Sequence, residues 1–161
     1  MIAVRSYDID LIKSIVCEPE VFRTVSDDCI NPEDYTPEVI GECWLTVDNE
    51  QETVAAYNFH VINAITLQMH VHVLPFFRLK YAREATKAAL SWIVSQAPKG
   101  FAKIVIFIPS VYPKVVNFAK KFGFKVEGIN TKSDMVGGVI CDRVMVGSTF
   151  TEISEWLQHE K

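Results

Sequence analysis

The sequence predicts a single α/β domain, residues 1–161, built of short strands and helices in alternation. Two observations lead to this prediction. The chain has 161 residues, of which 49% are hydrophobic and 22% are charged, and this size and composition suit one well-buried globular domain. Segments with the period of a strand and segments with the period of a helix follow one another, with no linker, repeat or low-complexity segment between them.

The N-terminal part carries a strand signal and two helix signals. Residues Ile2–Arg5 are expected to form a strand, and Asp8, a residue type that caps helix N-termini, precedes apolar residues at helical spacing over 9–16. A second short helix is expected over 20–26. The segment 27–37 is rich in acidic residues and contains two X-Pro steps, so it is expected to be a loop that borders a site.

The middle of the chain predicts a β-hairpin, a buried strand and a long helix. Residues 42–47 and 53–62 are rich in strand-forming residues and are separated by a short polar turn. Residues 64–74 are apolar at most positions and rich in β-branched side chains, which predicts a central strand that ends at Pro75. Apolar residues then recur at helical spacing through 81–96, the longest predicted helix.

The C-terminal part continues the alternation. Residues 102–108 have the fully apolar pattern of a buried strand, and an amphipathic helix over 111–122 is followed by Gly123 in the position of a C-cap. The remaining predicted elements are strands over 124–129 and 139–146, separated by a loop that contains Gly137 and Gly138, and a short helix over 150–158.

Composition and charge exclude several classes of protein. A formal net charge of −4 gives no general attraction for a nucleic acid, so any anion site must be a local patch. Charges within the first ten residues interrupt the apolar core that a secretory signal needs, and no segment is apolar over the length of a membrane span. A cytoplasmic protein is expected. The four cysteines are widely spaced, so neither a zinc site nor a disulfide framework is predicted, and all four are expected to be reduced: Cys17, Cys29, Cys43 and Cys141.

The start of the longest helix has an unusual charge. Helix N-termini carry a partial positive charge and favour acidic or hydroxyl residues, yet residues 78–87 contain four basic residues and one acidic residue, a net charge of +3. A bound polyanion would explain this, because backbone N–H groups, the helix dipole and basic side chains would converge on its oxygens. The alternative is a solvated basic helix face that pairs with acidic neighbours.

Three motifs in order resemble the GNAT acyltransferase family. Residues 73–78, Val-Leu-Pro-Phe-Phe-Arg, match in spacing the Val-x-Pro-x-x-Arg pattern that in the family joins a central strand to a pyrophosphate-binding loop and helix. Tyr-Pro-Lys at 112–114 through Phe-Gly-Phe at 122–124 is similar to a later family helix and its terminal Gly-Phe. Asp-Arg-Val-Met at 142–145 is similar to the family's closing strand. The resemblance covers nearly the whole chain.

This resemblance implies a mixed, mostly antiparallel sheet of six to seven strands, with helices on both faces and two central strands that splay apart. It implies acetyl-CoA as the cofactor and an amine of a small molecule or protein as the acceptor, and it leaves a homodimer open. Backbone groups of Val71 and Val73, unpaired where the strands splay, would bind the pantetheine arm. The pyrophosphate would lie against residues at the start of the long helix: Arg78, Lys80, Tyr81, Ala82, Arg83 and Glu84.

The sequence departs from the family at two places. The family usually has two small residues after the motif arginine, whereas here Ala82 is the only small residue in that stretch. The family's acid tyrosine, four residues before the glycine, is replaced by Ala119, and Tyr112 is a substitute candidate at the other end of the helix. These departures favour a second interpretation, a GNAT-like structural or binding module without catalysis, such as occurs in bacteriophages.

The general base that this reaction needs is predicted to be a histidine on the central strand. His70 and His72 project to the same face because strand side chains alternate, although the sequence does not show which face meets the substrate. The alternative for each is a hydrogen-bonded core histidine. His60 and His159 add to no constellation, and without a third ligand at a convincing spacing no metal site is predicted.

Other reaction classes lack their motifs. The sequence contains no Gly-x-Ser-x-Gly, no Walker loop and no Gly-x-Gly-x-x-Gly.

Two further segments are expected to border the site. Phe76 and Phe77 cannot both point inward, so one of them lines a groove or a partner surface. The acidic segment 27–38 is expected either to attract a cationic amine or to be a solvated surface loop.

Overall fold

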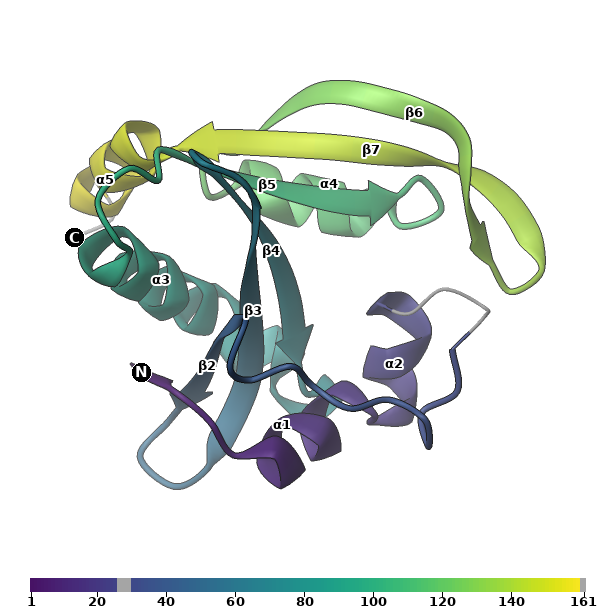
Figure 1. The fold of residues 1–161 in the computed structure, drawn as a ribbon, viewed down its shortest axis with the longest axis horizontal. Coiled ribbons are helices and arrows are strands. Elements are labelled where there is room, and N and C mark those ends of the chain that lie inside the picture. Colours follow the sequence, from purple (N-terminus) through teal and green to yellow (C-terminus); the bar gives the residue numbers. More distant parts are fainter. Residues whose placement is uncertain (26–29, 160–161) are drawn as a thin grey trace. The chain divides into compact units, whose positions relative to one another are not determined.

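The computed structural model describes residues 1–25 and 30–159, and Figure 1 shows its elements. Each predicted helix and strand has a counterpart, with shifts at its ends. In chain order they are β1 (Ile2–Arg5), α1 (Ile9–Val16), α2 (Pro19–Val25), β2 (Cys43–Asp48), β3 (Thr53–Asn63), β4 (Thr66–Val73), the 3-10 helix η1 (Pro75–Phe77), α3 (Arg78–Gln96), β5 (Lys103–Pro109), α4 (Pro113–Lys120), β6 (Lys125–Val136), β7 (Val139–Thr149) and α5 (Phe150–His159). None of these described helices is long and apolar enough to cross a membrane.

The strands form a seven-stranded sheet in the order β1-β2-β3-β4-β5-β7-β6. The pairings of β1 with β2, β2 with β3, β5 with β7 and β6 with β7 are antiparallel. The pairing of β4 with β5 is parallel and covers only Thr66–Gln68 against Lys103–Val105. The predicted mixed, mostly antiparallel sheet of six to seven strands is therefore confirmed.

The described residues form two compact units. The first unit comprises Met1–His60 and Met69–Gln96, and the second comprises Val61–Gln68 and the chain from Ala97 onward. Strands β3 and β4 therefore each have residues in both units. That residues 1–161 work as one domain stays a prediction.

In the first unit, helices cover both faces of the sheet. The N-terminal helices share a core cluster with Trp44 of β2 and Ala56 of β3. Asp8 starts α1 as predicted, because its carboxylate accepts a hydrogen bond from the Leu11 N–H at 2.9 Å. The next residue of β3, Tyr57, faces the other way, and its hydroxyl lies 2.9 Å from that of Thr86 in α3.

Helix α3 begins three residues earlier than its periodicity predicts. The 3-10 turn η1 runs directly into it at Arg78, with Pro75 at the first position, where no backbone N–H is needed. Its buried face consists of small and aliphatic side chains, Ala85, Thr86, Ala89, Leu90 and Ile93. The helix contacts β1 and β2 in the same unit. Helix α3 therefore packs on the first unit's sheet.

In the second unit, β6 and β7 form a longer hairpin than predicted. The loop expected between 129 and 139 is wrong, because β6 continues to Val136 and only Gly137 and Gly138 make the turn. Their φ angles of 58° and 75° lie in the left-handed region that glycine adopts without strain. Residues 130–134 are polar, so their sequence did not indicate a strand. The pairing of β6 with β7 also shifts register between Asn130 and Asp134.

Candidate functional site

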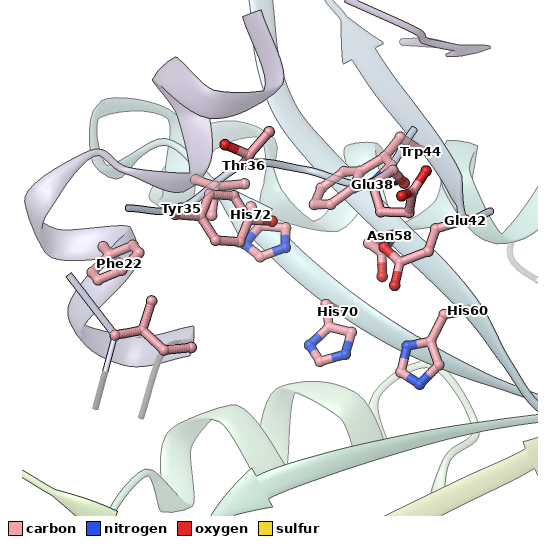
Figure 2. A pocket seen from close by; sticks show the side chains of 12 residues that line it. Phe22, Tyr35, Thr36, Glu38, Glu42, Trp44, Asn58, His60, His70 and His72 are labelled. Carbon is pink, nitrogen blue, oxygen red and sulfur yellow. Dashed lines mark hydrogen bonds between the residues drawn. The ribbon is translucent and has the colours of Figure 1, made fainter. Parts of the chain in front are cut away.

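A pocket of about 290 Å³ lies in the first unit, and Figure 2 shows its side chains. It is formed by the two N-terminal helices, the segment before β2, and strands β2, β3 and β4. It is lined by Val16, Phe22, Ile30, Tyr35, Thr36, Glu38, Glu42, Trp44, Asn58, His60, His70 and His72. Residues 30, 35, 36 and 38 belong to the predicted acidic segment, whose residues 27–29 lie outside the described part of the chain.

Four rings form a row along this pocket. The Trp44 ring stacks on the His72 ring with centroids 5.6 Å apart, and the His72 ring is nearly parallel to that of His70 at 6.4 Å. The row ends at His60 of β3, 5.6 Å from the His70 ring. Both β4 histidines therefore project to one face, as predicted, and this is the face that the pocket opens on.

His72 is buried and uncharged. Its side chain is 4% exposed, and neither Nδ1 nor Nε2 has a hydrogen-bond partner among the described residues. Burial first, and then the neighbouring His70, lower the pKa of His72 to about 3. The expected alternative of a hydrogen-bonded core histidine is therefore wrong for His72, because the ring is in the core but its nitrogens are unsatisfied.

The pocket also contains two carboxylates. Glu42 Oε2 accepts a hydrogen bond of 2.8 Å from the side-chain amide of Asn58, which is 3% exposed. Glu38 Oε1 accepts the N–H groups of Ile40 at 2.9 Å and Gly41 at 3.1 Å, and these bonds lower its pKa. No ion pair joins either carboxylate to a basic side chain among residues 1–25 and 30–159.

Aromatic side chains make up the opposite side of the pocket. The Phe22 and Tyr35 rings meet edge to face at 6.3 Å. Burial, followed by the charge of Glu42, raises the pKa of Tyr35 to about 12, so this phenol stays neutral. Trp44 donates a hydrogen bond of 3.2 Å from Nε1 to the Glu38 carbonyl, which fixes the segment before β2 on the pocket.

Arg78, the predicted pyrophosphate residue, makes two contacts within the first unit. Its Nε donates to the Val73 carbonyl at 3.1 Å, and its Nη1 lies 3.5 Å from the Glu20 carboxylate. This ion pair is exposed and therefore weak. The Val73 carbonyl, one of the groups expected to bind the pantetheine arm, already accepts this hydrogen bond.

The other predicted cofactor residues surround the start of α3. The Lys80 ammonium lies 4.6 Å from the centre of the Tyr81 ring, and the Ala82 carbonyl accepts a hydrogen bond from Thr86 at 2.8 Å. Arg83 and Glu84 are exposed, and no acidic residue occupies the first turn. Val71 lies half-buried on β4, on the face away from the histidines.

Phe76 and Phe77 differ in burial as the sequence predicts. Phe76 is 88% exposed, and Phe77 is buried at 7%. The Phe77 ring lies 5.9 Å from the Tyr81 ring, so the buried phenylalanine packs beside the start of α3. Phe76 is therefore the one that faces outward.

Tyr112 lies in the second unit, and all pocket-lining residues lie in the first. It occupies the N-cap position of α4 and donates its backbone N–H to the Pro109 carbonyl at 3.0 Å. His159 is also in the second unit, at the end of α5. The prediction of Gly123 as the C-cap is wrong by two residues, because α4 ends at Lys120 and Lys121 is its C-cap; Gly123, with a φ of 82°, donates its N–H to the Lys120 carbonyl in the turn that follows.

Sequence reasoning missed several residues of the pocket. The statement that His60 adds to no constellation is wrong, because β3 and β4 are neighbours in the sheet and the His60 ring stacks on His70. The alternation of β3 was the available signal. Glu42 and Asn58 come from adjacent strands in the same way.

Side chains that could bind a metal ion do not cluster in the part of the chain that the structure describes. The described residues include no group of three or more His, Cys, Asp or Glu side chains that could hold a metal ion. Cys17, Cys43 and Cys141 are free thiols, and Cys29 lies outside the described residues.

Comparisons with solved structures identify the fold. A protein of Streptococcus mutans, smu.2055, is 16% identical with a TM-score of 0.71, over 93% of this chain and 99% of that one. A spermidine N-acetyltransferase of Vibrio cholerae, solved with CoA and spermine, is 14% identical with a TM-score of 0.77, over 94% and 96% of the two chains. No family model matches the sequence, and no curated protein matches it.

The chain therefore has the fold of the GNAT acetyltransferases, the fold that its motifs predicted. At these identities the likeness concerns the fold, and the activity depends on the residues of this chain.

Proposed function

We propose that the chain is an N-acetyltransferase, with residues 1–161 acting as one domain, that transfers an acetyl group from acetyl-CoA to a primary amine of a small molecule or protein. The observation that carries the proposal is the pocket of the first unit, which His70 and Glu42 line together. A carboxylate attracts an ammonium group, and a nearby imidazole can take its proton. The fold shared with acetyltransferases supports the same class of reaction.

The general base in this proposal is His70. Its ring is half-buried in the pocket and stacks on the half-buried His60, which can pass a proton onward. His72 was an equal candidate on the sequence, but its lowered pKa makes it too weak a base near neutral pH. His72 therefore has a binding role in the proposal.

When bound, acetyl-CoA supplies an acetyl group activated as a thioester. Glu42 holds the ammonium form of the acceptor, His70 removes a proton, and the neutral nitrogen attacks directly, so that no covalent enzyme intermediate is needed. As the N–C bond formed, the thioester C–S bond would break, the acylated nitrogen would give up its second proton, and the leaving thiolate would gain one. Tyr112, the substitute candidate for the family's missing acid tyrosine, is the proposed donor of that proton.

The residues at the start of α3 fit a pyrophosphate. The first helical turn contains Arg78, Lys80 and Tyr81, has no acidic side chain, and is followed by Arg83. The positive end of the helix dipole and basic side chains together stabilise phosphate oxygens. Ala82 supplies the small residue, and the backbone of Val71 remains the proposed partner of the pantetheine arm.

A second candidate function is a binding module without catalysis. The observation that favours it is the hydrogen bond from Arg78 to the Val73 carbonyl, which uses a backbone acceptor expected for the cofactor. Acetyl-CoA binding distinguishes the two candidates, because a ligand that binds the folded state raises its melting temperature by mass action.

The test is a thermal-shift titration of the full chain with acetyl-CoA. We expect a rise in melting temperature for the wild type, and a loss of most of that rise when Arg78→Ala and Arg83→Ala are combined. Lys99→Ala, an exposed substitution beyond the end of α3, is the matched control and should behave like the wild type. No shift at millimolar acetyl-CoA would overturn the proposed function and leave the binding module.

A further inference from the structure

The two sides of the pocket differ in chemistry. Figure 2 shows Glu42 with Asn58 on the side of His60 and His70, and Phe22 and Tyr35 on the other side. Ile30, which is 45% exposed, also lines the pocket, together with the buried Val16. A ligand that satisfies the whole pocket therefore has one polar end and one apolar body.

The polar side of the pocket suits a positive charge. Glu42 carries its negative charge at the pocket with Asn58 as its hydrogen-bond donor, and it forms no ion pair with the described basic residues. Glu38 contributes a second carboxylate on the same side, whereas the side lined by Val16, Phe22, Ile30 and Tyr35 has none to pair with a second, distant ammonium group. One ammonium group next to Glu42 would lie on the side of His70.

The apolar side suits a flat ring. Phe22 and Tyr35 meet edge to face, and the Trp44 and His72 rings stack nearby, so an aryl group would gain ring contacts in addition to buried area. A cavity of about 150 Å³ can hold benzene, so a pocket of about 290 Å³ has room for an aryl ring with a short amine-bearing chain.

His72 adds a separate observation. It is 4% exposed, it lines the pocket, and both ring nitrogens lack partners among the described residues. A neutral imidazole offers one N–H donor and one acceptor, and leaving both unmade in a buried site is costly. A hydroxyl group can satisfy either nitrogen, because it both donates and accepts.

We infer that the pocket selects an aryl monoamine whose ring carries a hydroxyl group. The inference rests on the proposed function and deepens it by naming the acceptor class. The ammonium lies at Glu42, the ring lies against Tyr35 and Phe22, and the hydroxyl pairs with His72. A polyamine is a poor ligand, because its further ammonium groups would lie among Ile30, Val16 and the aromatic rings, where charge is poorly solvated.

The experiment is calorimetric titration of the full chain without acetyl-CoA, so that binding is measured apart from catalysis. The probes are tyramine, phenethylamine, 2-phenylethanol and spermidine. We expect tyramine to bind most tightly, phenethylamine to bind several-fold more weakly, and the uncharged alcohol and spermidine to bind about tenfold or more weakly than tyramine. Spermidine binding as tightly as tyramine would overturn the inference.

Two variants assign the contacts. Glu42→Gln should weaken the binding of tyramine about tenfold, because a charge-assisted hydrogen bond is lost. Glu50→Gln, in the exposed β2–β3 turn, should leave the affinity for tyramine unchanged. His72→Phe keeps a ring at the stack and should abolish the preference for tyramine over phenethylamine. An unchanged preference in that variant, or equal binding of the two amines to the wild type, would overturn the hydroxyl contact.

Binding and activity are separable outcomes. Selective tyramine binding without acetyl transfer would overturn the proposed function and support the ligand class. Acetylation of spermidine in preference to tyramine would support the proposed function and overturn the ligand class.

Discussion

Replacing His72 by phenylalanine should make the protein less sensitive to acid. His72 is 4% exposed with unpartnered nitrogens, and burial lowers its pKa from 6.5 to about 3. The folded state therefore holds the ring neutral, while the unfolded chain binds a proton on it below about pH 6.5. Since the unfolded state binds more protons, stability falls as the pH falls from about 6.5 toward about 3.

The magnitude follows from the size of the shift. Each pKa unit corresponds to ~1.4 kcal/mol of difference between the protonation states. At about pH 5, which is about 1.5 units below the unfolded value, His72 alone should have removed ~2 kcal/mol of the stability present at about pH 7.5. His72→Phe should lack this loss and keep the ring contact with Trp44.

The assay is urea unfolding followed by circular dichroism at about pH 7.5 and pH 5, for the wild type and the variant. Other groups that titrate in this range contribute to both proteins, so the difference between the two pH dependences isolates His72. His159→Phe, at an exposed position of α5, is the matched control and should retain the wild-type dependence. Equal pH dependence of wild type and His72→Phe would refute the reasoning.

Two further predictions concern hydrogen bonds away from the pocket. Tyr57→Phe removes the buried hydroxyl that pairs with Thr86, and it should lower the free energy of unfolding by ~1 kcal/mol in urea denaturation; an unaltered midpoint would contradict the importance of this bond. Thr149→Ala removes the hydroxyl that accepts the Glu152 N–H at the start of α5 and should cost ~1 kcal/mol, whereas a variant as stable as the wild type would show that this cap contributes nothing.

Local signals predicted most elements of the fold. Asp8 and Pro75 act on their immediate neighbours, and the structure shows the cap at Leu11 and the turn that leads into α3. The hairpin of β6 and β7 was predicted too short, because its polar segment 130–134 lacks strand alternation and is held instead by cross-strand contacts such as the Arg143–Asp134 pair.

The pocket was only partly predictable. Alternation along β4 placed His70 and His72 on one face without any knowledge of other strands. The stacking of His60 and the bond from Asn58 to Glu42 depend on which strands are neighbours, and that is set by contacts far apart in the sequence. The lack of hydrogen-bond partners at the His72 nitrogens depends on how the surrounding elements pack, and the periodicity of β4 does not predict that.

The most direct test of the central claim is mass spectrometry of tyramine after incubation with the protein and acetyl-CoA, with release of free CoA measured in parallel. We predict that the wild type adds one acetyl group per CoA released, and that His70→Gln lowers kcat about a hundredfold while tyramine still binds. Absence of acetylated amine with the wild type, in a sample that binds both acetyl-CoA and tyramine, would contradict the account.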